Sequence, residues 1–542
     1  MSQHILLLNL TRLGDMLQSQ PLIEDMHDSG HKISLVCLEN FAPASSLMRH
    51  VEHVYILPGA KLLADTQRCW RSAAARLLAL AREIGEKTRP DRVINLTPTL
   101  PARLLAKLLT PPSRNVLGFG MDPEGFGVNG SVWASFLSGA SASRVNTPFN
   151  IADMFRRMGA ALCSPETTRR PGVFVLEKPS LLAGAAAEEL LRQVENAGKG
   201  DAAHLRGYVG FQLGASETRR QWPAEYFAEL GEGLWKTAGF CPVLLGTKAE
   251  QGLADAYSAR ASSPFVNAVG KTGIPELAAI LGRTRLLVTN DTGTMHLAAG
   301  LGVSCLAFFL ASAQPWDTGP YLEDCCCLEP AISCHPCAYG SACSSGEACL
   351  RRISPRLVGD ILLERLESGA WGIPSQALRE QARVWITATD KHGFASLRCL
   401  SAHEVEDRSR WLEQQRTVWR QILDELDRGA GAGPSSETER PLSALSPDFR
   451  NRVAPVLARA AQMLALLTEQ GRLAGQNAMA GQLFLRNCER LRQALDACPP
   501  LASLSHFWRE LVQDRGGDMR ETLRLTELLA GHLDRWSAAQ KG

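Results

Sequence analysis

Three short polar stretches, each following an apolar run, carry residue types that could transfer a group to a hydroxyl. The first is Leu-Thr-Arg-Leu-Gly-Asp at 10–15, where Gly14 permits a tight turn and Asp15 supplies a carboxylate. A carboxylate on a turn between a strand and a helix faces the edge of a sheet where ligands bind, and it can act as a general base. The alternative is that Asp15 only caps the next helix, and the local sequence alone favours it.

The second stretch, Gly-Ala-Ser-Glu-Thr-Arg-Arg-Gln-Trp-Pro at 214–223, combines small residues with a hydroxyl and two guanidinium groups. Ser216 could bond a phosphate oxygen, and Arg219 or Arg220 could hold a diphosphate through two parallel hydrogen bonds. Pro223 suits the first turn of a following helix. An arginine-containing surface loop explains the stretch equally well.

The third stretch, Val-Thr-Asn-Asp-Thr-Gly-Thr-Met-His-Leu-Ala-Ala at 288–299, places a polar turn between an apolar strand and an alanine-rich helix. The turn is Asp291, Thr292 and Gly293, and exposed amides at such a helix start form an anion site. His296 lies one turn into the helix, from where it could reach the same ligand. The alternative is a structural histidine, which is the more common role.

These turns need a scaffold of alternating strands and helices, and the sequence predicts two such series. The first has strands at 4–10, 32–38, 54–57 and 92–96, with helices starting at Met16 and spanning about 68–87. The second has strands at 208–213, 241–245, 265–267 and 286–289, with helices at 224–237 and 274–282. We therefore expect an α/β protein with two doubly wound domains that face a cleft.

Length, composition and a Gly- and Ser-rich stretch indicate how the chain divides into domains. The 542 residues exceed one hydrophobic core, and 45% hydrophobic with 21% charged residues is ordinary globular composition. We predict Rossmann-like domains at 1–165 and 166–375, the second with a Cys-rich segment at 325–349. A hairpin at 382–399 and a helix at 404–428 form an extension over 376–428, and a flexible linker follows at 429–437. A domain of three or four helices over 438–542 completes the chain.

Together the three stretches resemble glycosyltransferase family 9, the ADP-heptose:lipopolysaccharide heptosyltransferases, in order, spacing and context over residues 4–360. The resemblance implies a GT-B fold, with the nucleotide-sugar donor on the second domain and the acceptor approaching from the first. It puts Asp15 at the catalytic-base position. The donor-binding positions that it implies are Ser216, Arg220, Asp291, Thr292, Gly293 and His296. Family members commonly carry lysine where Arg220 stands, which leaves the donor's identity less certain than the reaction class.

Four further residues on the predicted turns are candidate donor contacts. Thr11 and Gly14 belong to the first turn, and Gly246 and Glu250 to another turn after a strand, where they could contact the ribose or base. The chain contains no Asp-x-Asp pair of the kind that metal-dependent glycosyltransferases use. We therefore expect metal-independent transfer with no cofactor. Inversion would follow from single displacement, and the resemblance implies ADP-heptose as the donor.

The acceptor is expected to be a lipopolysaccharide-type or other surface glycan. Between 61 and 114 there are eleven Lys or Arg residues and four acids, a bias that could attract an acidic glycan or an anionic membrane, although a solvated helix face also explains it. Arg103 and Lys107 are the candidate acceptor contacts. The alternatives are another nucleotide-sugar, a protein acceptor recruited by the C-terminal helices, or a non-catalytic sugar-nucleotide binder.

Charge and hydropathy limit the partners and the location. A net charge of +2 gives no general attraction for nucleic acid, and the apolar run Ile5 to Leu8 is too short for a signal peptide. We expect a cytoplasmic protein, with peripheral association at the inner face of the membrane as an option. The four thiols Cys334, Cys337, Cys343 and Cys349 have spacings that could ligate a structural metal, with disulfides or reduced cysteines as alternatives.

Overall fold

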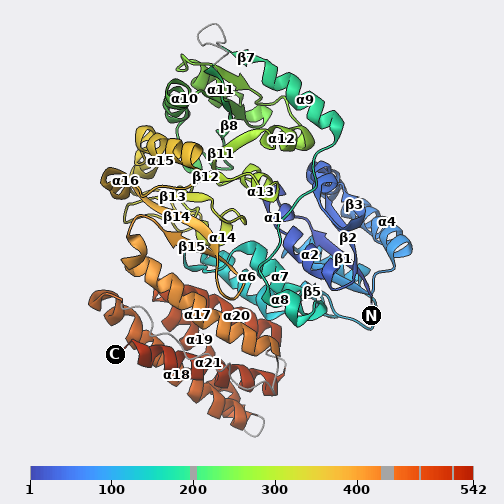
Figure 1. Cartoon of the computed structure of the whole chain (residues 1–542). Coiled ribbons are helices and arrows are strands. Elements are labelled where there is room, and N and C mark those ends of the chain that lie inside the picture. Colours follow the sequence, from blue (N-terminus) through green and yellow to red (C-terminus); the bar gives the residue numbers. More distant parts are fainter. Residues whose placement is uncertain (1, 196–203, 429–444, 475–477, 516–517, 541–542) are drawn as a thin grey trace. The chain divides into compact units, whose positions relative to one another are not determined.

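The computed structural model describes residues 2–195, 204–428, 445–474, 478–515 and 518–540 (Figure 1). These residues form two compact units. Unit 1 contains 1–97, 108–114 and 149–403, and unit 2 contains 98–107, 115–148 and 404–542. The predicted linker at 429–437 lies outside the described residues.

The first sheet of unit 1 forms where the sequence predicts it. Its strands run parallel in the order β3 (Val51–Leu57), β2 (Lys32–Leu38), β1 (His4–Asn9) and β4 (Arg92–Asn95). Ile5 to Leu8 are fully buried, as expected for a central parallel strand. The helix expected from Met16 is two helices, α1 (Leu13–Leu17) and α2 (Gln20–Asp28), because Pro21 begins a new helix.

The long helix expected over about 68–87 is confirmed as α4 (Trp70–Thr88), and a further helix, α3 (Gly59–Arg68), precedes it. The two helices meet at Cys69, whose backbone is extended. Ala73, Ala81 and Ile84 form the buried stripe of α4. Among the described residues, no helix is both long enough and apolar enough to cross a bilayer.

The second sheet of unit 1 has nine strands among the described residues and carries most of the candidate site. Its parallel core has the order β13 (Cys326–Pro330), β12 (Cys305–Phe308), β11 (Thr284–Asn290), β8 (Gly207–Gln212), β9 (Phe240–Leu245) and β10 (Phe265–Asn267). The antiparallel strand β7 (Val194–Glu195) borders β10. The other helices of unit 1 are α7 (Ile151–Met158), α8 (Pro165–Arg169), α9 (Leu181–Arg192), α10 (Ala224–Ala238), α11 (Gln251–Ser258), α12 (Ile274–Leu281), α13 (Gly293–Gly300), α14 (Pro315–Thr318), α15 (Pro355–Ser368) and α16 (Gln376–Gln381).

The predicted hairpin is correct, but the boundary at 375 is wrong. Strand β14 (Ala382–Thr389) pairs antiparallel with β13, and β15 (Ala395–Cys399) pairs with β14. Trp385, buried on β14, donates a 2.8 Å hydrogen bond to the buried carboxylate of Glu329 on β13. The hairpin is therefore part of the second sheet, since backbone pairing continues across the predicted boundary.

Unit 2 combines the C-terminal helices with an excursion from the first Rossmann-like half. The excursion contains β5 (Leu117–Met121), β6 (Gly127–Asn129), α6 (Val132–Ala142) and most of α5 (Leu100–Leu109). The C-terminal helices are α17 (Asp407–Arg428), α18 (Pro447–Ala474), α19 (Ala478–Asp496), α20 (Ala502–Arg515) and α21 (Met519–Ala539), so that four helices follow residue 445, as predicted. They are drawn in orange to red in Figure 1.

Close contacts fasten the excursion to these helices. An added Cβ at Gly139 on α6 would lie 2.9 Å from the backbone of Phe507 on α20, so the two helices touch at their backbones. The Phe136 ring lies 4.9 Å from Trp419, and the Asn129 side chain donates to Asp514 at 3.0 Å. The predicted domain of 438–542 is therefore one part of a larger unit, because its apolar surface is buried against 115–148 and α17.

Candidate functional site

The three predicted turns all follow the carboxyl ends of parallel strands. Asp15 comes after β1, Ser216 and Arg220 come after β8, and Asp291 follows β11 directly. This edge of a doubly wound sheet is where ligands bind in such folds, because helix starts and loops gather there. All three turns belong to unit 1.

Helices α1 and α13 touch, and this contact joins the first turn to the third. An added Cβ at Gly14 would lie 2.8 Å from Cδ2 of His296, and one at Gly293 would lie 3.2 Å from the Leu13 side chain. Figure 1 shows the two helices next to each other. Asp15 is half-buried in the first turn of α1, and its backbone carbonyl accepts a 3.0 Å hydrogen bond from Asn9. The structure thus places the helix that bears Asp15 against the helix that bears His296.

A buried ion pair joins the second turn to the third. The Arg220 guanidinium donates to the Asp291 carboxylate, and the two side chains are only 6% and 9% exposed. Arg220 also donates to Ser216 Oγ at 3.4 Å, while its buried Nε has no hydrogen-bond partner among the described residues. Arg219 points elsewhere, since it donates to the backbone carbonyl of Ser341 at 2.8 Å. Of the two arginines, Arg220 is the one that belongs to the site.

The core of the second sheet holds this arginine loop in place. The Trp222 indole is buried and stacks on Phe308 with ring centroids 4.3 Å apart. The backbone amide of Trp222 donates to the side-chain oxygen of Asn290 at 2.9 Å. The side-chain amide of Asn290 in turn donates to the carbonyl of Leu213 at 2.9 Å. Asn290 therefore ties the turn after β8 to the turn after β11. Sequence analysis did not single it out, although a polar residue at the end of a buried strand is a signal that could have found it.

His296 is buried and neutral at physiological pH. Burial lowers the pKa of its imidazole to about 4, and the nearby Asp291 carboxylate only partly opposes this shift. Its Nδ1 is buried and has no hydrogen-bond partner among the described residues. A buried polar nitrogen without a partner is uncommon, which indicates a place where a ligand group can complete the site.

Glu250 closes the site on the side of β9. Its carboxylate accepts hydrogen bonds from the backbone amide and the hydroxyl of Thr247, at 2.5 and 2.9 Å. An added Cβ would lie 1.4 Å from Glu250 at Gly214 and 2.9 Å from it at Gly246. The carboxylate thus occupies the space that side chains at both glycines would take.

Two other donor candidates have local partners. The Thr11 hydroxyl donates to Asn9, and Thr292 precedes α13 with its hydroxyl 3.3 Å from that of Thr289. Both lie on the expected turns, and their contact with a donor stays a prediction.

The acceptor candidates Arg103 and Lys107 belong to unit 2. Arg103 donates to the carbonyls of Pro98, Gly120 and Val128 at 3.0, 2.7 and 3.1 Å, and to the Asn129 side chain at 3.0 Å. These bonds give Arg103 a structural task in supporting the β5–β6 hairpin. Lys107 is exposed on α5. Acceptor binding by either residue stays a prediction.

The four cysteines of the predicted metal site lie near one another. Burial raises the pKa of Cys337 and of Cys349, and the neighbouring thiols of Cys334 and Cys343 add to both shifts. All four are free thiols, so the disulfide alternative is not realised. Within the described ranges, no group of three or more His, Cys, Asp or Glu side chains is placed to hold a metal ion. A structural metal at these four thiols stays a prediction.

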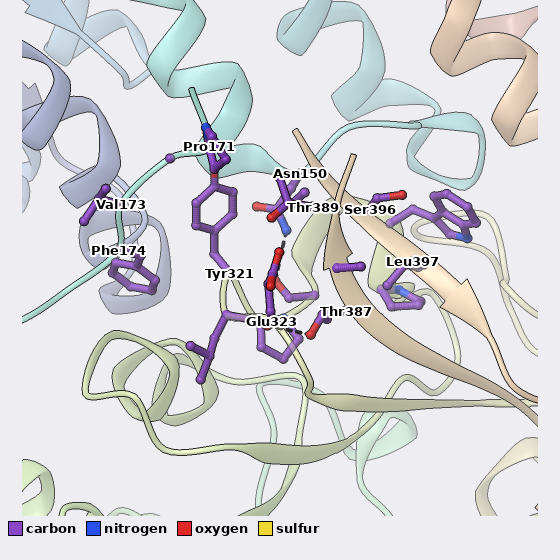
Figure 2. Close-up of a pocket in the computed structure, with 18 of the residues that line it drawn as sticks. Asn150, Pro171, Val173, Phe174, Tyr321, Glu323, Thr387, Thr389, Ser396 and Leu397 are labelled. Carbon is purple, nitrogen blue, oxygen red and sulfur yellow. Dashed lines mark hydrogen bonds between the residues drawn. The ribbon is translucent and has the colours of Figure 1, made fainter. Parts of the chain in front are cut away.

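A separate cavity of about 500 Å³ lies on another part of unit 1 (Figure 2). The segment 171–175, the loop 315–323 and the β14–β15 hairpin line it. Tyr321, which is labelled in Figure 2, donates to Asp153 at 2.7 Å, and Asn150 donates to the carbonyl of Gly319 at 3.0 Å. None of the predicted site residues lines this cavity.

Comparison with known proteins agrees with the resemblance. Residues 177–344 match the sequence profile of glycosyltransferase family 9 (heptosyltransferase). Lipopolysaccharide heptosyltransferase 1 of Pseudomonas aeruginosa is 29% identical over 130 residues, which is 24% of this chain and 36% of the relative. Lipooligosaccharide heptosyltransferase 2 of Haemophilus ducreyi is 31% identical over 105 residues, which is 18% of this chain and 30% of the relative. The chain thus spans about a third of the length of these curated relatives.

The fold has a counterpart among solved structures. The glycosyltransferase family 9 structure from Veillonella parvula aligns with a TM-score of 0.53 and 20% identity, over 68% of this chain and 98% of that one. This likeness and the two sheets confirm the expected GT-B fold with a C-terminal helical region.

Proposed function

Residues 177–344 belong to glycosyltransferase family 9, and on that premise we propose that this chain transfers a sugar from a nucleotide diphosphate to an acceptor hydroxyl. One observation carries the proposal. The Arg220–Asp291 ion pair, the Ser216 hydroxyl and the amides at the start of α13 form a donor cradle, and α1 with its carboxylate Asp15 packs against that same helix.

The donor half of the proposal rests on charge. Loss of the sugar leaves negative charge on the diphosphate, and Arg220, the Ser216 hydroxyl and the amides at the start of α13 can stabilise it. The unpartnered Nε of Arg220 and Nδ1 of His296 are buried polar atoms that a donor could satisfy. We propose that these residues together replace the metal ion that other glycosyltransferases use.

The acceptor half rests on Asp15. Its carboxylate takes the proton of an acceptor hydroxyl while that oxygen attacks the anomeric carbon of the sugar. The new carbon–oxygen bond forms as the bond to the diphosphate breaks on the opposite side, so the configuration inverts. The proton stays on Asp15, and the electron pair leaves with the diphosphate.

The names of the relatives suggest the substrates. They indicate a heptose as the sugar and a lipopolysaccharide-type glycan as the acceptor. From the family resemblance we propose ADP-heptose as the donor, and we propose contact with the inner face of the membrane, where such an acceptor would be anchored. A different nucleotide-sugar or a protein acceptor would use the same cradle and base. A non-catalytic sugar-nucleotide binder would need only the cradle.

Thermal unfolding with ADP-, UDP-, GDP- and CMP-linked sugars tests the donor. A ligand present at about 100 times its Kd adds about 2.7 kcal/mol to the free energy of unfolding, so the preferred donor should raise Tm most. We expect ADP-heptose to do so. Stabilisation by another nucleotide-sugar would correct the donor, and stabilisation by none would contradict the proposed function.

The Asp15→Asn variant tests the base. Loss of general base catalysis should lower kcat by about 10² to 10⁴, while the Kd for ADP should stay near that of the wild type. Glu83→Gln, which removes an exposed carboxylate on α4, serves as the control and should leave both values unchanged. Normal turnover by Asp15→Asn would remove Asp15 from the mechanism.

A further inference from the structure

Three arginines converge on one cavity of about 350 Å³ in unit 1. Arg206 precedes β8, Arg285 is the second residue of β11, and Arg365 lies in the last turn of α15. The other residues that line the cavity are Phe240, Leu286, Leu366 and Gly369. A cavity of this size falls at the small end of the range of roughly 300–1,000 Å³ for ligand pockets.

The cavity lies at the opposite edge of the sheet from the donor cradle. Arg206, Phe240 and Arg285 stand at the amino ends of β8, β9 and β11, whereas the cradle follows the carboxyl ends of β8 and β11. A six-residue strand at about 3.3 Å per residue puts about 20 Å between the two edges. The cavity is therefore a different place from the proposed donor site.

Acids neutralise little of this positive charge. Within the described part of the chain, Asp324 pairs with Arg365 at 2.7 Å, but no ion pair or side-chain hydrogen bond forms at Arg206 or Arg285. No Asp or Glu is among the described residues that line the cavity. Among the described residues, the donors of the Arg206 and Arg285 guanidinium groups therefore have no protein acceptor.

Two of the arginines stack on aromatic rings, and one of them, Arg365, also pairs with a carboxylate. The Arg206 guanidinium lies over the Phe240 ring at 5.5 Å from its centroid, and that of Arg365 lies over Trp371 at 5.4 Å. Gly207 leaves room beside them, since an added Cβ would lie 3.5 Å from the Arg285 side chain and 3.6 Å from Phe240. Stacking on a ring fixes a guanidinium while leaving its edge free to bind an oxyanion.

We propose that this cavity binds a diphosphate group, held by Arg206 and Arg285 with Arg365 beside them. Guanidinium groups bind phosphate oxygens through paired, charge-assisted hydrogen bonds. A diphosphate offers oxygens to more than one arginine, which suits a cavity whose cations come from three elements. This site does not rest on the proposed transferase activity.

Calorimetric titration of the whole protein with inorganic pyrophosphate, in the presence of saturating ADP, tests the site. ADP occupies the donor cradle if the proposed function is correct, so pyrophosphate then reports on the arginine cavity. Arg206→Ala/Arg285→Ala should weaken pyrophosphate binding at least tenfold, because two charged donors are lost. Arg206→Lys/Arg285→Lys should give an intermediate loss, since lysine keeps the charge without the paired donors.

The control variant is Arg192→Ala/Arg283→Ala, which removes the same charge from arginines that are paired with Glu189 and Glu188 outside the cavity. It should bind pyrophosphate like the wild type. Equal weakening by both double variants would show a general charge effect and overturn the site, as would normal binding by Arg206→Ala/Arg285→Ala. Failure of ADP to bind would contradict the proposed function alone.

Discussion

Replacing Gly14 by alanine tests the contact that joins the two halves of the candidate site. The new Cβ would lie 2.8 Å from His296 Cδ2, whereas ordinary van der Waals contact begins at 3.4 Å, so α1 and α13 must separate by about 0.6 Å. A misplacement of about 1 Å in an active site can cost about 10²-fold in rate, so we expect kcat to fall roughly tenfold. Overpacking of this kind also lowers the free energy of unfolding by about 1–3 kcal/mol.

The assay compares kcat, the Kd for the nucleotide and the urea midpoint of Gly14→Ala with those of the wild type. Gly252→Ala on α11 is the control, because no atom lies within 4 Å of its added Cβ, and it should leave kcat unchanged. The nucleotide Kd should rise as well, since the added Cβ displaces His296 and the start of α13, which are proposed donor contacts. Wild-type turnover and stability in Gly14→Ala would refute the reasoning, because α1 and α13 would then not touch in the working protein.

Three further outcomes follow from burial and charge. Asp291→Ala leaves the Arg220 guanidinium buried without its counterion and should lower the free energy of unfolding by about 3–5 kcal/mol, measured in urea, while Asp291→Ala/Arg220→Met should recover part of the loss. Burial holds the pKa of His296 near 4 in the folded protein. As the pH is lowered from about 6.5 to 4, this histidine therefore binds a proton in the unfolded chain but not in the folded one. The free energy of unfolding should fall over that window by up to about 3 kcal/mol. His296→Gln should remove this part of the pH dependence in urea titrations from pH 7 to 4, and an identical profile would contradict it. Hydrogen bonds from Ser72, its backbone amide first, lower the pKa of the exposed Cys69 thiol, so iodoacetamide should modify Cys69 first and Cys69→Ser should lose the fastest phase.

Local patterns were enough to predict the strands that precede the three turns, but β5, β6, β7, β12 and β13 were not predicted. The buried run Ile5 to Leu8 and the seven residues of β2 form the strands that hydrophobicity indicates, since a parallel strand is apolar on both faces. The turns after β1, β8 and β11 then had to meet the carboxyl edges of their sheets. The roles of Asp15, Ser216 and His296 in catalysis and binding stay predictions.

Contacts between segments that are distant in sequence could not be predicted from local patterns. Nothing in residues 115–148 shows that Gly139 must meet Phe507, or that Asn129 bonds Asp514, because neither pair shares a local period. The domain boundary predicted at 375 is wrong for the same reason, since β14 pairs with β13, a strand more than 50 residues earlier in the chain. Asn290 was missed because its side chain bonds backbone groups that are distant in sequence, the amide of Trp222 and the carbonyl of Leu213.

The glycines of the site are required by neighbouring side chains and not only by an approaching ligand. A glycine beside a polar turn suggests that a ligand approaches the backbone, and Gly14, Gly214 and Gly293 all stand beside such turns. In the structure the carboxylate of Glu250 fills the space at Gly214, His296 fills it at Gly14, and Leu13 fills it at Gly293. Each glycine therefore admits another residue of the same site, and a substitution there acts by moving that residue. It follows that variants at these glycines should alter the geometry of the site even before a ligand arrives, which distinguishes them from variants that only obstruct the donor.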